Sequence, residues 1–274
     1  MGKPIAKADR YEPLDVTERW FADLYRYIEP PGFIMSSQID MSRSGGIIEL
    51  ARESGVRLTY SHIILRAVGL ALHRMGELHC IVEGSRRLIP STVDASIPVG
   101  GAGVRFAPAT VVVRDIGRLT LPEVAAAMTQ KSAAIRESEP EDFSKLRKVA
   151  FLLNRKWVRG MLIPRFLRSA KWRREYMGTV LVSFLKDVDS FVPLTPYPGL
   201  VVAAGQVRDT VVAESGKVCV RPVMNLSCCV DHKCWDGLTA SRFMTAVKTI
   251  LIEGELEAEF VATVMSQPAI ALNN

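Results

Sequence analysis

This 274-residue chain lacks long apolar runs, a metal-binding cysteine motif and, over one stretch of thirty residues, any acidic side chain. No apolar segment approaches the roughly 20 residues that a membrane-spanning helix needs. The first thirty residues carry charges throughout and contain no signal-peptide core. The 48% hydrophobic and 23% charged fractions exclude a fibrous or disordered chain. We therefore expect a globular protein that resides in the cytoplasm.

Cysteine and histidine are scarce and irregularly spaced. The five cysteines form an odd set without a Cys-x-x-Cys pair, which argues against a disulfide framework and a zinc site. Cys234 lies two residues after His232, but no further histidine or cysteine stands at ligand spacing beside them. The other histidines, His62, His73 and His79, also lack a partner at such spacing, and we interpret them as structural or solvated. We expect no metal.

Acidic residues are absent between positions 145 and 174, where eleven lysines and arginines stand. The net charge of the chain is +6, so the remainder is slightly acidic. Aromatic residues such as Trp157 and Trp172 are interspersed with these cations, and Pro164 is expected to divide the segment into two helices. Three interpretations stay open: a solvated cap whose apolar residues pack on the body, a docking site for an acidic partner such as a phosphorylated carrier, and a surface for lipid or nucleic acid. We consider the last the weakest.

Hydrophobic periodicity predicts alternating helices and strands along the rest of the chain. The expected elements are a helix at 15–28, a strand at 33–41, helices at 47–53 and 61–75, strands at 93–99 and 109–113 joined by the glycine-rich residues 100–103, a helix ending near 137, strands at 179–184, 200–206, 210–213 and 218–230, and helices beginning at 237 and 255.

Residues 230–237 place a single imidazole where an alternating strand ends and a helix begins. His232 stands at that junction, a position suited to a general base. Asp236 precedes the helical stretch and can cap its first backbone N–H groups. Spacing alone leaves two interpretations open: a catalytic base, or an incidental histidine beside a capping aspartate.

The same run resembles a known family signature. The pattern Asp231-His232-x-x-x-Asp236-Gly237 followed by Ala240 and Phe243 is similar to the C-terminal motif in the catalytic domain of the 2-oxoacid dehydrogenase (dihydrolipoamide) acyltransferases, which share their fold with chloramphenicol acetyltransferase. Further resemblances follow in chain order, at residues 58–72, 93–118, 178–183 and 189–193.

This resemblance implies an α+β fold, in which a two-layer mixed sheet carries helices on one face. It implies that residues 1–274 form a single catalytic domain, with an N-terminal arm at 1–14 and a basic helical insertion at 140–176. No lipoyl domain, lipoyl group or peripheral-subunit-binding domain is expected, so the domain would be free-standing. The family is built on trimers with active sites between subunits, and a homotrimer, with possible further assembly, is expected here.

The resemblance also assigns roles. His232 matches the general base, Ser183 matches the serine that donates a hydrogen bond to the tetrahedral oxyanion, and Asp236 matches an aspartate that braces the histidine loop together with an arginine. The expected activity is acyl transfer between a coenzyme A or carrier thioester and a small thiol, hydroxyl or amine acceptor. Coenzyme A or its acyl ester would then be a substrate, and the basic segment would suit an acidic carrier protein; membrane and nucleic-acid partners are not expected.

Two departures from the family pattern support an alternative. The family's Asn-Leu-Gly after the serine is replaced by Phe184-Leu185-Lys186, and the basic insertion has no counterpart in the complex subunits. The alternative is a catalytically altered oligomeric scaffold or partner-binding relative of the acyltransferase core.

Overall fold

The computed structural model describes residues 16–17, 20, 32–83, 86–104, 107–137, 148–194 and 199–266. In chain order the elements are β1 (Gly32–Asp40), α2 (Ser42–Glu53), α3 (Tyr60–Met75), the short helix η1 (Gly76–Leu78), β2 (Ile81–Glu83), β3 (Arg86–Leu88), β4 (Ala95–Val104), β5 (Ala107–Val113), α4 (Leu121–Glu137), α6 (Ala150–Leu153), α7 (Lys156–Arg168), α8 (Ala170–Met177), β6 (Val180–Phe184), β7 (Leu200–Glu214), β8 (Lys217–Asp231), α9 (Gly237–Ile252) and α10 (Glu255–Ser266). Within these ranges no helix combines the length and the apolar character needed to cross a membrane.

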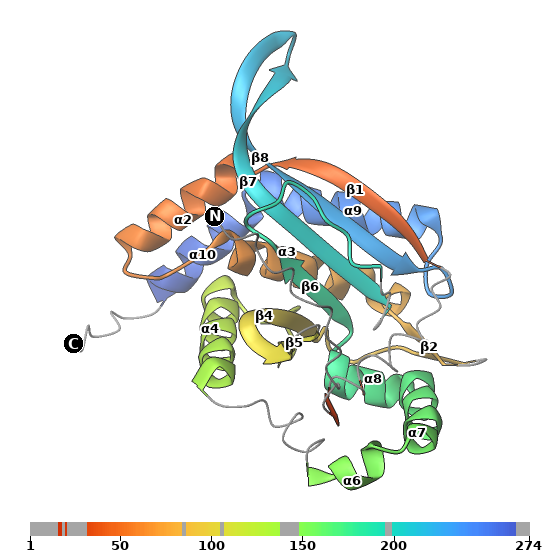
Figure 1. Cartoon of the computed structure of the whole chain (residues 1–274). Coiled ribbons are helices and arrows are strands. Elements are labelled where there is room, and N and C mark those ends of the chain that lie inside the picture. Colours follow the sequence, from red (N-terminus) through yellow and green to blue (C-terminus); the bar gives the residue numbers. More distant parts are fainter. Residues whose placement is uncertain are drawn as a thin grey trace, which may run out of the picture.

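A six-stranded mixed sheet in the order β1-β8-β7-β6-β4-β5 forms one layer of the fold (Figure 1). β6 pairs in parallel with both of its neighbours, β4 and β7, whereas the other pairs are antiparallel. β2 and β3 form a separate two-stranded sheet. β7 and β8 continue past the other strands as a projecting two-stranded ribbon, which we define as residues 208–222 (Figure 1). Its turn has positive φ at Ser215 and Gly216, as a tight hairpin turn requires.

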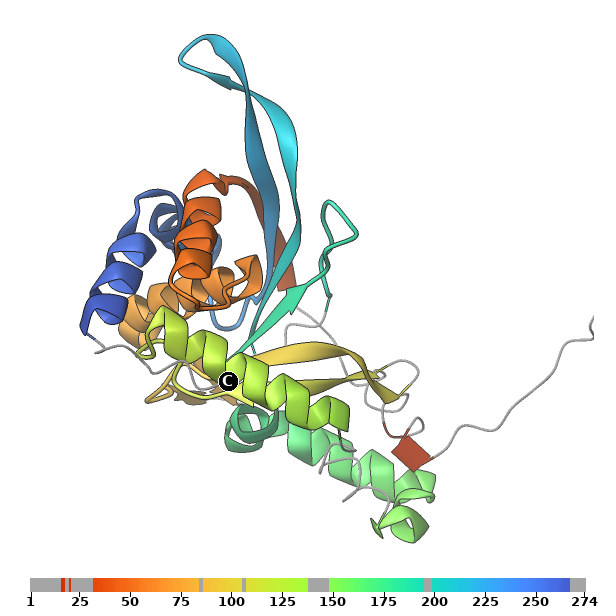
Figure 2. The ribbon, with the colours of Figure 1, turned by 90° about the vertical axis from the view of Figure 1, so that its left-hand side faces the viewer.

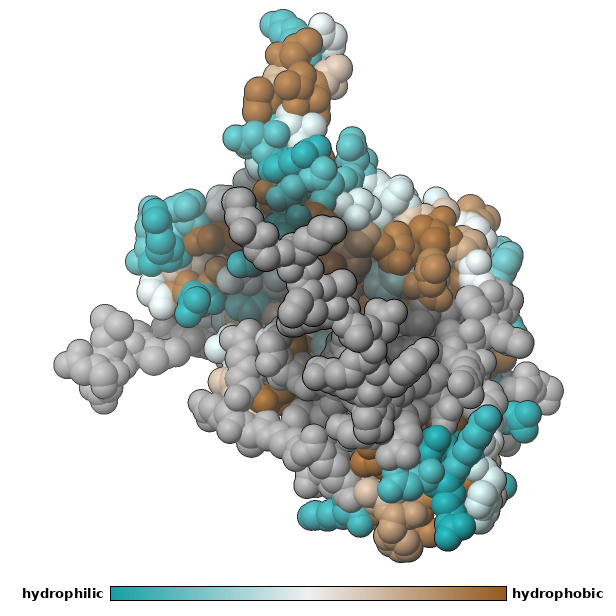
Figure 3. All heavy atoms as spheres, in the orientation of Figure 1, coloured by the Kyte–Doolittle hydropathy of each residue, from teal (hydrophilic) through white to brown (hydrophobic). Residues whose placement is uncertain are grey.

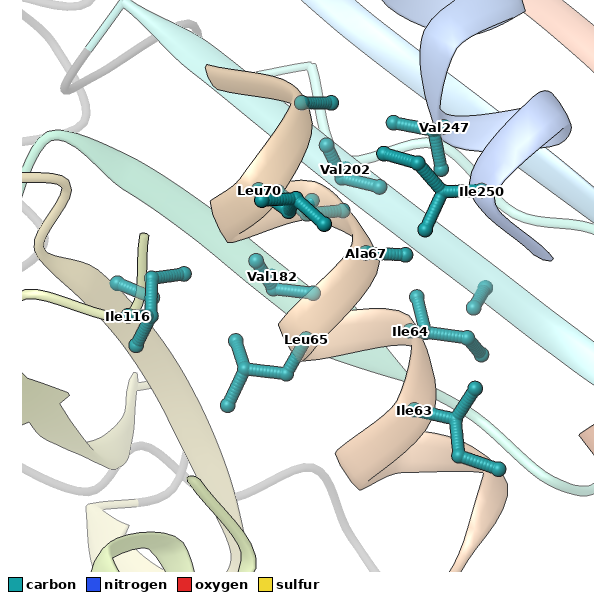
Figure 4. Close-up of a cluster of buried hydrophobic side chains, with 14 of the residues drawn as sticks. Ile63, Ile64, Leu65, Ala67, Leu70, Ile116, Val182, Val202, Val247 and Ile250 are labelled. Atoms are coloured by element: carbon teal, nitrogen blue, oxygen red, sulfur yellow. The ribbon is translucent and has the colours of Figure 1, made fainter. Parts of the chain in front are cut away.

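Helices α2, α3, α9 and α10 cover one face of this sheet (Figure 2). α3 lies at the centre: its residues from His62 to Leu72 are all buried. Ile64 and Ala67 of α3 pack with Val202 of β7 and with Ile250 of α9 in one apolar cluster (Figure 4). Full burial of an Ile or Leu side chain contributes about 1.5–3 kcal/mol relative to exposure, so this cluster dominates the packing. The predicted α+β architecture, a mixed sheet with helices on one face, is confirmed.

Most predicted elements are confirmed, but several boundaries were wrong. α2 begins at Ser42 rather than at Ile47, because the Gly45-Gly46 pair lies inside the helix and does not break it. The Asp40 carboxylate accepts hydrogen bonds from the backbone N and Oγ of Ser42, at 2.8 and 2.6 Å, and so fixes this start.

Two strand predictions also need correction. The predicted strands at 200–206 and 210–213 are one strand, β7, whose register shifts between Ala204 and Val207. The glycines at 100–103 were predicted as a connection, but they extend β4, and the register with β5 shifts between Val99 and Gly103. In both places an irregular pairing, which the sequence pattern does not show, keeps a strand continuous.

Pro164 does not divide the basic segment, contrary to the prediction. It lies inside α7, and the chain breaks later, at Ser169. A proline inside a helix removes one backbone hydrogen bond. Ile163 and Leu167 are both buried on the same side of α7, and this burial offsets the loss.

Residues 148–177, which contain α6, α7 and α8, form a unit that we call the basic lobe. Two neighbouring arginines, the buried Arg173 and the partly buried Arg174, attach it to the body. The Arg173 guanidinium donates to the backbone carbonyl of Val82 in β2, and Arg174 pairs with the buried Asp94 carboxylate at 3.2 Å. The predicted arm at 1–14, nearly all of the predicted helix at 15–28, and residues 140–147 of the predicted insertion lie outside the described residues.

The close approach of α3 to the chain after β5 makes Gly69 a test of the packing. A Cβ at Gly69 would lie 2.5 Å from the carbonyl oxygen of Ile116. Because this contact involves backbone, we expect Gly69→Ala to lower the free energy of unfolding by about 1–3 kcal/mol in urea denaturation. Gly46→Ala, at an exposed helix position with nothing within 4 Å of the added Cβ, is the control and should stabilise slightly. A Gly69→Ala protein as stable as the wild type would contradict this packing.

Candidate active site

His232 lies in a tight turn between the end of β8 and the start of α9. The backbone N–H groups of Cys234 and Trp235 donate to the Asp231 carbonyl, at 2.9 and 3.2 Å. The Asp231 carboxylate accepts from the Lys233 backbone N–H at 2.9 Å. These bonds close the turn on its inner side and leave His232 exposed at its outer side.

One hydrogen bond fixes the orientation and the tautomer of the His232 ring. Nδ1 of His232 lies 3.1 Å from the backbone carbonyl oxygen of Trp235. A carbonyl oxygen only accepts, so Nδ1 must carry the hydrogen. In the neutral ring Nε2 then has a free lone pair, and within the described part of the chain it has no hydrogen-bond partner. The Phe33 ring of β1 packs edge-on against the imidazole, with 5.0 Å between centroids. The arrangement is that of an oriented base.

Trp235 holds the carbonyl to which His232 binds. Its side chain is 4% exposed and packs against Phe243 of α9, with 5.4 Å between ring centroids. Its indole Nε1 donates to the Leu78 carbonyl. The sequence interpretation did not identify Trp235 or Phe33. The tryptophan inside the motif was the available signal, but nothing in the sequence placed Phe33 beside the ring.

Asp236 caps α9, as its position predicted. Its Oδ1 accepts from the Thr239 backbone N–H at 2.8 Å. Hydrogen bonds from the Thr239 side chain and backbone, with the nearby charge of Arg242, lower the pKa of this carboxyl. Among the described residues Asp236 forms no ion pair, so the bracing arginine that the resemblance implies is not identified within this part of the chain. Asp236 therefore fixes the end of the turn that carries His232.

Ser183 lies on the sheet face opposite the helices. Val180 and Val182 of β6 belong to the core under the helices, and side chains alternate along a strand, so Ser183 points the other way. It is 8% exposed. Strand pairing aligns Ser183 with Ala203 of β7 and then with Ser227 of β8.

Register shows that one chain does not bring Ser183 and His232 together. The row through Ser183 crosses β8 at Ser227, and His232 follows five residues later. At about 3.3 Å per residue the two side chains are separated by roughly 16 Å along the strand direction alone. The base and the predicted oxyanion donor are therefore distant within one chain.

The segment that follows Ser183 covers part of the open sheet face. Ser190 Oγ lies 3.5 Å from Ser227 Oγ, and Asn225 Nδ2 donates to the Asp189 carbonyl at 3.1 Å. Gly205 permits this approach, since a Cβ there would lie 2.2 Å from the Asp189 carbonyl oxygen. At the end of β6 the segment borders a cavity of about 300 Å³ that is lined, among others, by Tyr60, Phe184, Leu185, Lys186 and Gly205. Phe184, Leu185 and Lys186, which directly follow Ser183 and depart from the family pattern, thus line an open pocket.

A thiol pair connects the histidine turn to the segment after η1. The Cys80 and Cys234 thiols hydrogen-bond each other, and a Cβ at Gly199 would lie 3.7 Å from both Cys234 Sγ and the Cys80 carbonyl oxygen. The bond from Cys234 lowers the pKa of the Cys80 thiol to about 7. It raises the pKa of Cys234. All five cysteines are free thiols in the structure.

The remaining histidines make no contact with His232 in the described part of the chain. His62 and His79 are buried, and burial lowers the pKa of both, that of His79 to about 4. His73 is exposed on α3. Within the described ranges no three His, Cys, Asp or Glu side chains gather as a metal ion would require.

Comparison with known families bears on this geometry. Residues 184–257 match the family model of the 2-oxoacid dehydrogenases acyltransferase (catalytic domain). The matched stretch contains β7, β8, the histidine turn and α9, and it begins directly after Ser183. Among curated proteins, the chain is 22% identical to the lipoamide acyltransferase component of the branched-chain alpha-keto acid dehydrogenase complex of Bacillus subtilis (strain 168), over 73% of this chain and 40% of that protein. The chain spans less than half the length of the curated relatives it matches.

Solved structures show the same fold. A probable dihydrolipoamide acetyltransferase from Listeria monocytogenes 4b F2365 superposes with a TM-score of 0.67 at 17% identity, covering 89% of this chain and 95% of that one. Two others each give 0.65 at 16% identity over 93% and 99%: the cubic core of a pyruvate dehydrogenase multienzyme complex, and an Azotobacter vinelandii dihydrolipoamide acetyltransferase investigated for the catalytic role of a serine, a histidine and an asparagine. A chloramphenicol acetyltransferase gives 0.51 at 16% identity over 87% and 98%.

The chain is thus similar over residues 184–257 to the catalytic domain of the 2-oxoacid dehydrogenase acyltransferases, and it has the fold that dihydrolipoamide acetyltransferase structures and chloramphenicol acetyltransferase share. The family model and the curated relatives it resembles are acyltransferases.

Proposed function

We propose that the chain is a cytoplasmic acyltransferase that moves an acyl group between a coenzyme A or carrier thioester and a small thiol, hydroxyl or amine acceptor. The observation that carries the proposal is the His232 ring, held through Nδ1 by the Trp235 carbonyl with Nε2 left free and exposed. An oligomeric scaffold has no need of an oriented imidazole. The family match over residues 184–257, which includes this turn, supports the same conclusion.

The reaction follows from the groups at hand. Nε2 of His232 removes the proton from the acceptor S–H, O–H or N–H as the acceptor attacks the thioester carbonyl carbon. The carbonyl oxygen gains the negative charge, and the Ser183 hydroxyl donates a hydrogen bond to it. The tetrahedral intermediate then breaks its C–S bond, and the departing thiolate takes the proton back from His232. No bond forms between the acyl group and the protein, so Ser183 acts as a donor and not as a nucleophile.

The active site requires a second copy of the chain. Ser183 and His232 are about 16 Å apart along the strands of one chain, too far to act on one carbonyl group. In a cyclic oligomer, His232 of one subunit meets Ser183 of the next. The relative that forms a cubic core supports this assembly, because cubic symmetry contains threefold axes. We therefore propose a homotrimer, with further assembly open to it.

The projecting ribbon supplies a surface for this assembly. On one of its faces Val211 and Val218 are 68% and 78% exposed, and Val220, directly opposite Val211, is 61% exposed. The apolar part of the ribbon, drawn brown just below its polar tip, stands clear of the body (Figure 3). An isolated two-stranded ribbon is only marginally stable in water, and contiguous exposed apolar side chains mark interaction sites. We propose that a neighbouring subunit covers this face.

The catalytic roles are tested by two substitutions. With acetyl-CoA as donor and dihydrolipoamide as acceptor, we expect His232→Ala to lower kcat by about 10²–10⁴-fold because the base is lost. Ser183→Ala should lower kcat by about 10²–10³-fold because the oxyanion loses a donor. Chromatographic measurement of released coenzyme A gives the rate, and His73→Ala, an exposed histidine on α3, is the control. Full activity in His232→Ala would disprove the mechanism.

The ribbon interface is tested by a charge pair. Val211→Lys combined with Val220→Glu places opposite charges across the ribbon, so strand pairing is kept while the apolar face is lost. We expect this variant to sediment as monomers in analytical ultracentrifugation. Met265→Lys, at an apolar position that is 83% exposed elsewhere, should assemble as the wild type does. If the double variant keeps the wild-type oligomeric state, the ribbon is not the interface.

A further inference from the structure

The basic lobe exposes large apolar side chains that the body does not cover. Phe151 of α6 is 72% exposed, Trp157 of α7 is 67% exposed, and Trp172 of α8 is 52% exposed. Met161 and Leu152 are also about half exposed. Two buried apolar residues of the lobe, Ile163 and Leu167, form a small cluster with Trp20 and Phe166 that is separate from the core of the body. The interpretation in which the apolar residues of this segment pack on the body therefore does not describe the exposed ones. Something other than the rest of the described chain must account for these.

The solvent side of α7 combines these apolar groups with arginines. Trp157, Met161, Arg165 and Arg168 are all exposed, and their spacing of four, four and three residues places them on one side of a helix. Ile163 and Leu167 are buried on the other side. Across the α7–α8 junction, Phe166 packs against Trp172 and Tyr176, with 6.3 and 5.8 Å between ring centroids. These contacts hold the exposed rings of Trp172 and Tyr176 against Phe166 on the outside of the lobe.

The charge of the lobe is positive apart from one acidic residue, Glu175, which pairs with Arg114 of the body. From residue 148 to residue 174 the chain has no acidic residue. Six cations of this stretch are exposed: Lys148, Arg155, Lys156, Arg165, Arg168 and Lys171. In Figure 3 the hydrophilic residues and the paler, partly apolar ones of this lobe lie side by side at the lower edge of the molecule, where Figure 1 draws α6 and α7. The surface is therefore both cationic and aromatic.

The chemistry of the exposed groups discriminates among anionic partners. A nucleic acid would pair with the cations but would leave Phe151, Leu152 and Met161 in water. A folded acidic protein binds through a shape-matched, well-packed contact, and the lobe presents single side chains on three separate helices. The headgroup region of an anionic bilayer accepts Trp and Phe rings at its apolar boundary and pairs with Lys and Arg at the phosphates. It also adapts to a convex surface.

We propose that the basic lobe binds the surface of membranes that contain anionic phospholipids, with Phe151, Trp157 and Trp172 entering the headgroup boundary and the exposed cations contacting phosphate. This peripheral contact is independent of the proposed acyl transfer and is not required for it. It would bring the protein to a lipid surface without a spanning segment.

The test is co-sedimentation of the whole chain with vesicles. We expect binding to vesicles of phosphatidylglycerol and phosphatidylcholine at low ionic strength, weakening as salt is added, and little binding to phosphatidylcholine alone. Arg165→Glu with Arg168→Glu, and separately Phe151→Ser with Trp157→Ser, should each lower the vesicle affinity by about tenfold or more. Brominated phosphatidylcholine in the anionic vesicles should quench tryptophan fluorescence in the wild type, and less so after Trp157→Phe with Trp172→Phe.

Matched controls separate the lobe from general charge and apolar exposure. Arg52→Glu with Arg57→Glu reverses two exposed cations near α2, and Met265→Ser removes an exposed apolar residue of α10; both should bind as the wild type does. Unchanged thermal unfolding midpoints confirm that the variants are folded. Equal binding to neutral and anionic vesicles, no binding at low salt, equal losses in the controls, or binding only to an acidic protein or to DNA would each overturn the proposal.

Discussion

The hydrogen bond between Nδ1 of His232 and the Trp235 carbonyl is the interaction on which the account of this protein depends. It sets the tautomer of the neutral ring, in which Nε2 is then the nitrogen that can accept a proton. Trp235 is itself held in place, because its side chain is buried against Phe243 and its indole N–H donates a hydrogen bond to the Leu78 carbonyl. The packing of β8 and α9 thus determines the tautomer and the orientation of the exposed His232 ring. The capping of α9 by Asp236 and the Cys80–Cys234 contact hold the same turn from its two sides.

A second constraint is the register of the sheet. The strands place Ser183 and His232 far apart on one chain, and the open sheet face around β1 exposes groups such as Ile34, which is 49% exposed. In the proposed mechanism, one chain therefore holds two separated parts of one reaction site. The proposal couples assembly to catalysis, because a neighbouring subunit would have to place the oxyanion donor beside the base. The apolar face of the ribbon is also uncovered within the described chain, and the same neighbouring subunit is proposed to cover it.

The sequence predicted those elements and site residues whose structure depends on neighbouring positions in the chain. Apolar period and capping predicted α3, β8 and α9, and the spacing around His232 predicted the strand-to-helix turn and the Asp236 cap. The pairing irregularity in β7 was missed because it depends on the pairing with β8. The passage of α7 through Pro164 was missed because burial of Ile163 and Leu167 outweighs the local helix-breaking signal. Phe33 was missed because its contact with the histidine ring exists only after β1 pairs with β8, whereas Trp235 stands inside the motif and only its role was missed. The exposure of Trp157 and Phe151 could not be read from composition, since a Trp-rich basic helix packs or stays exposed according to its neighbours.

The central claim, that one active site combines His232 of one subunit with Ser183 of another, is tested most directly by mixing two inactive variants. His232→Ala and Ser183→Ala chains carrying different affinity tags are co-expressed, and mixed oligomers are purified through both tags. A site is functional only where a His232-bearing subunit meets a Ser183-bearing one in the right order. Each mixed trimer has one such junction out of three, so the doubly tagged oligomers should recover about one third of the wild-type rate. Mixed oligomers that stay as inactive as either parent would contradict the account.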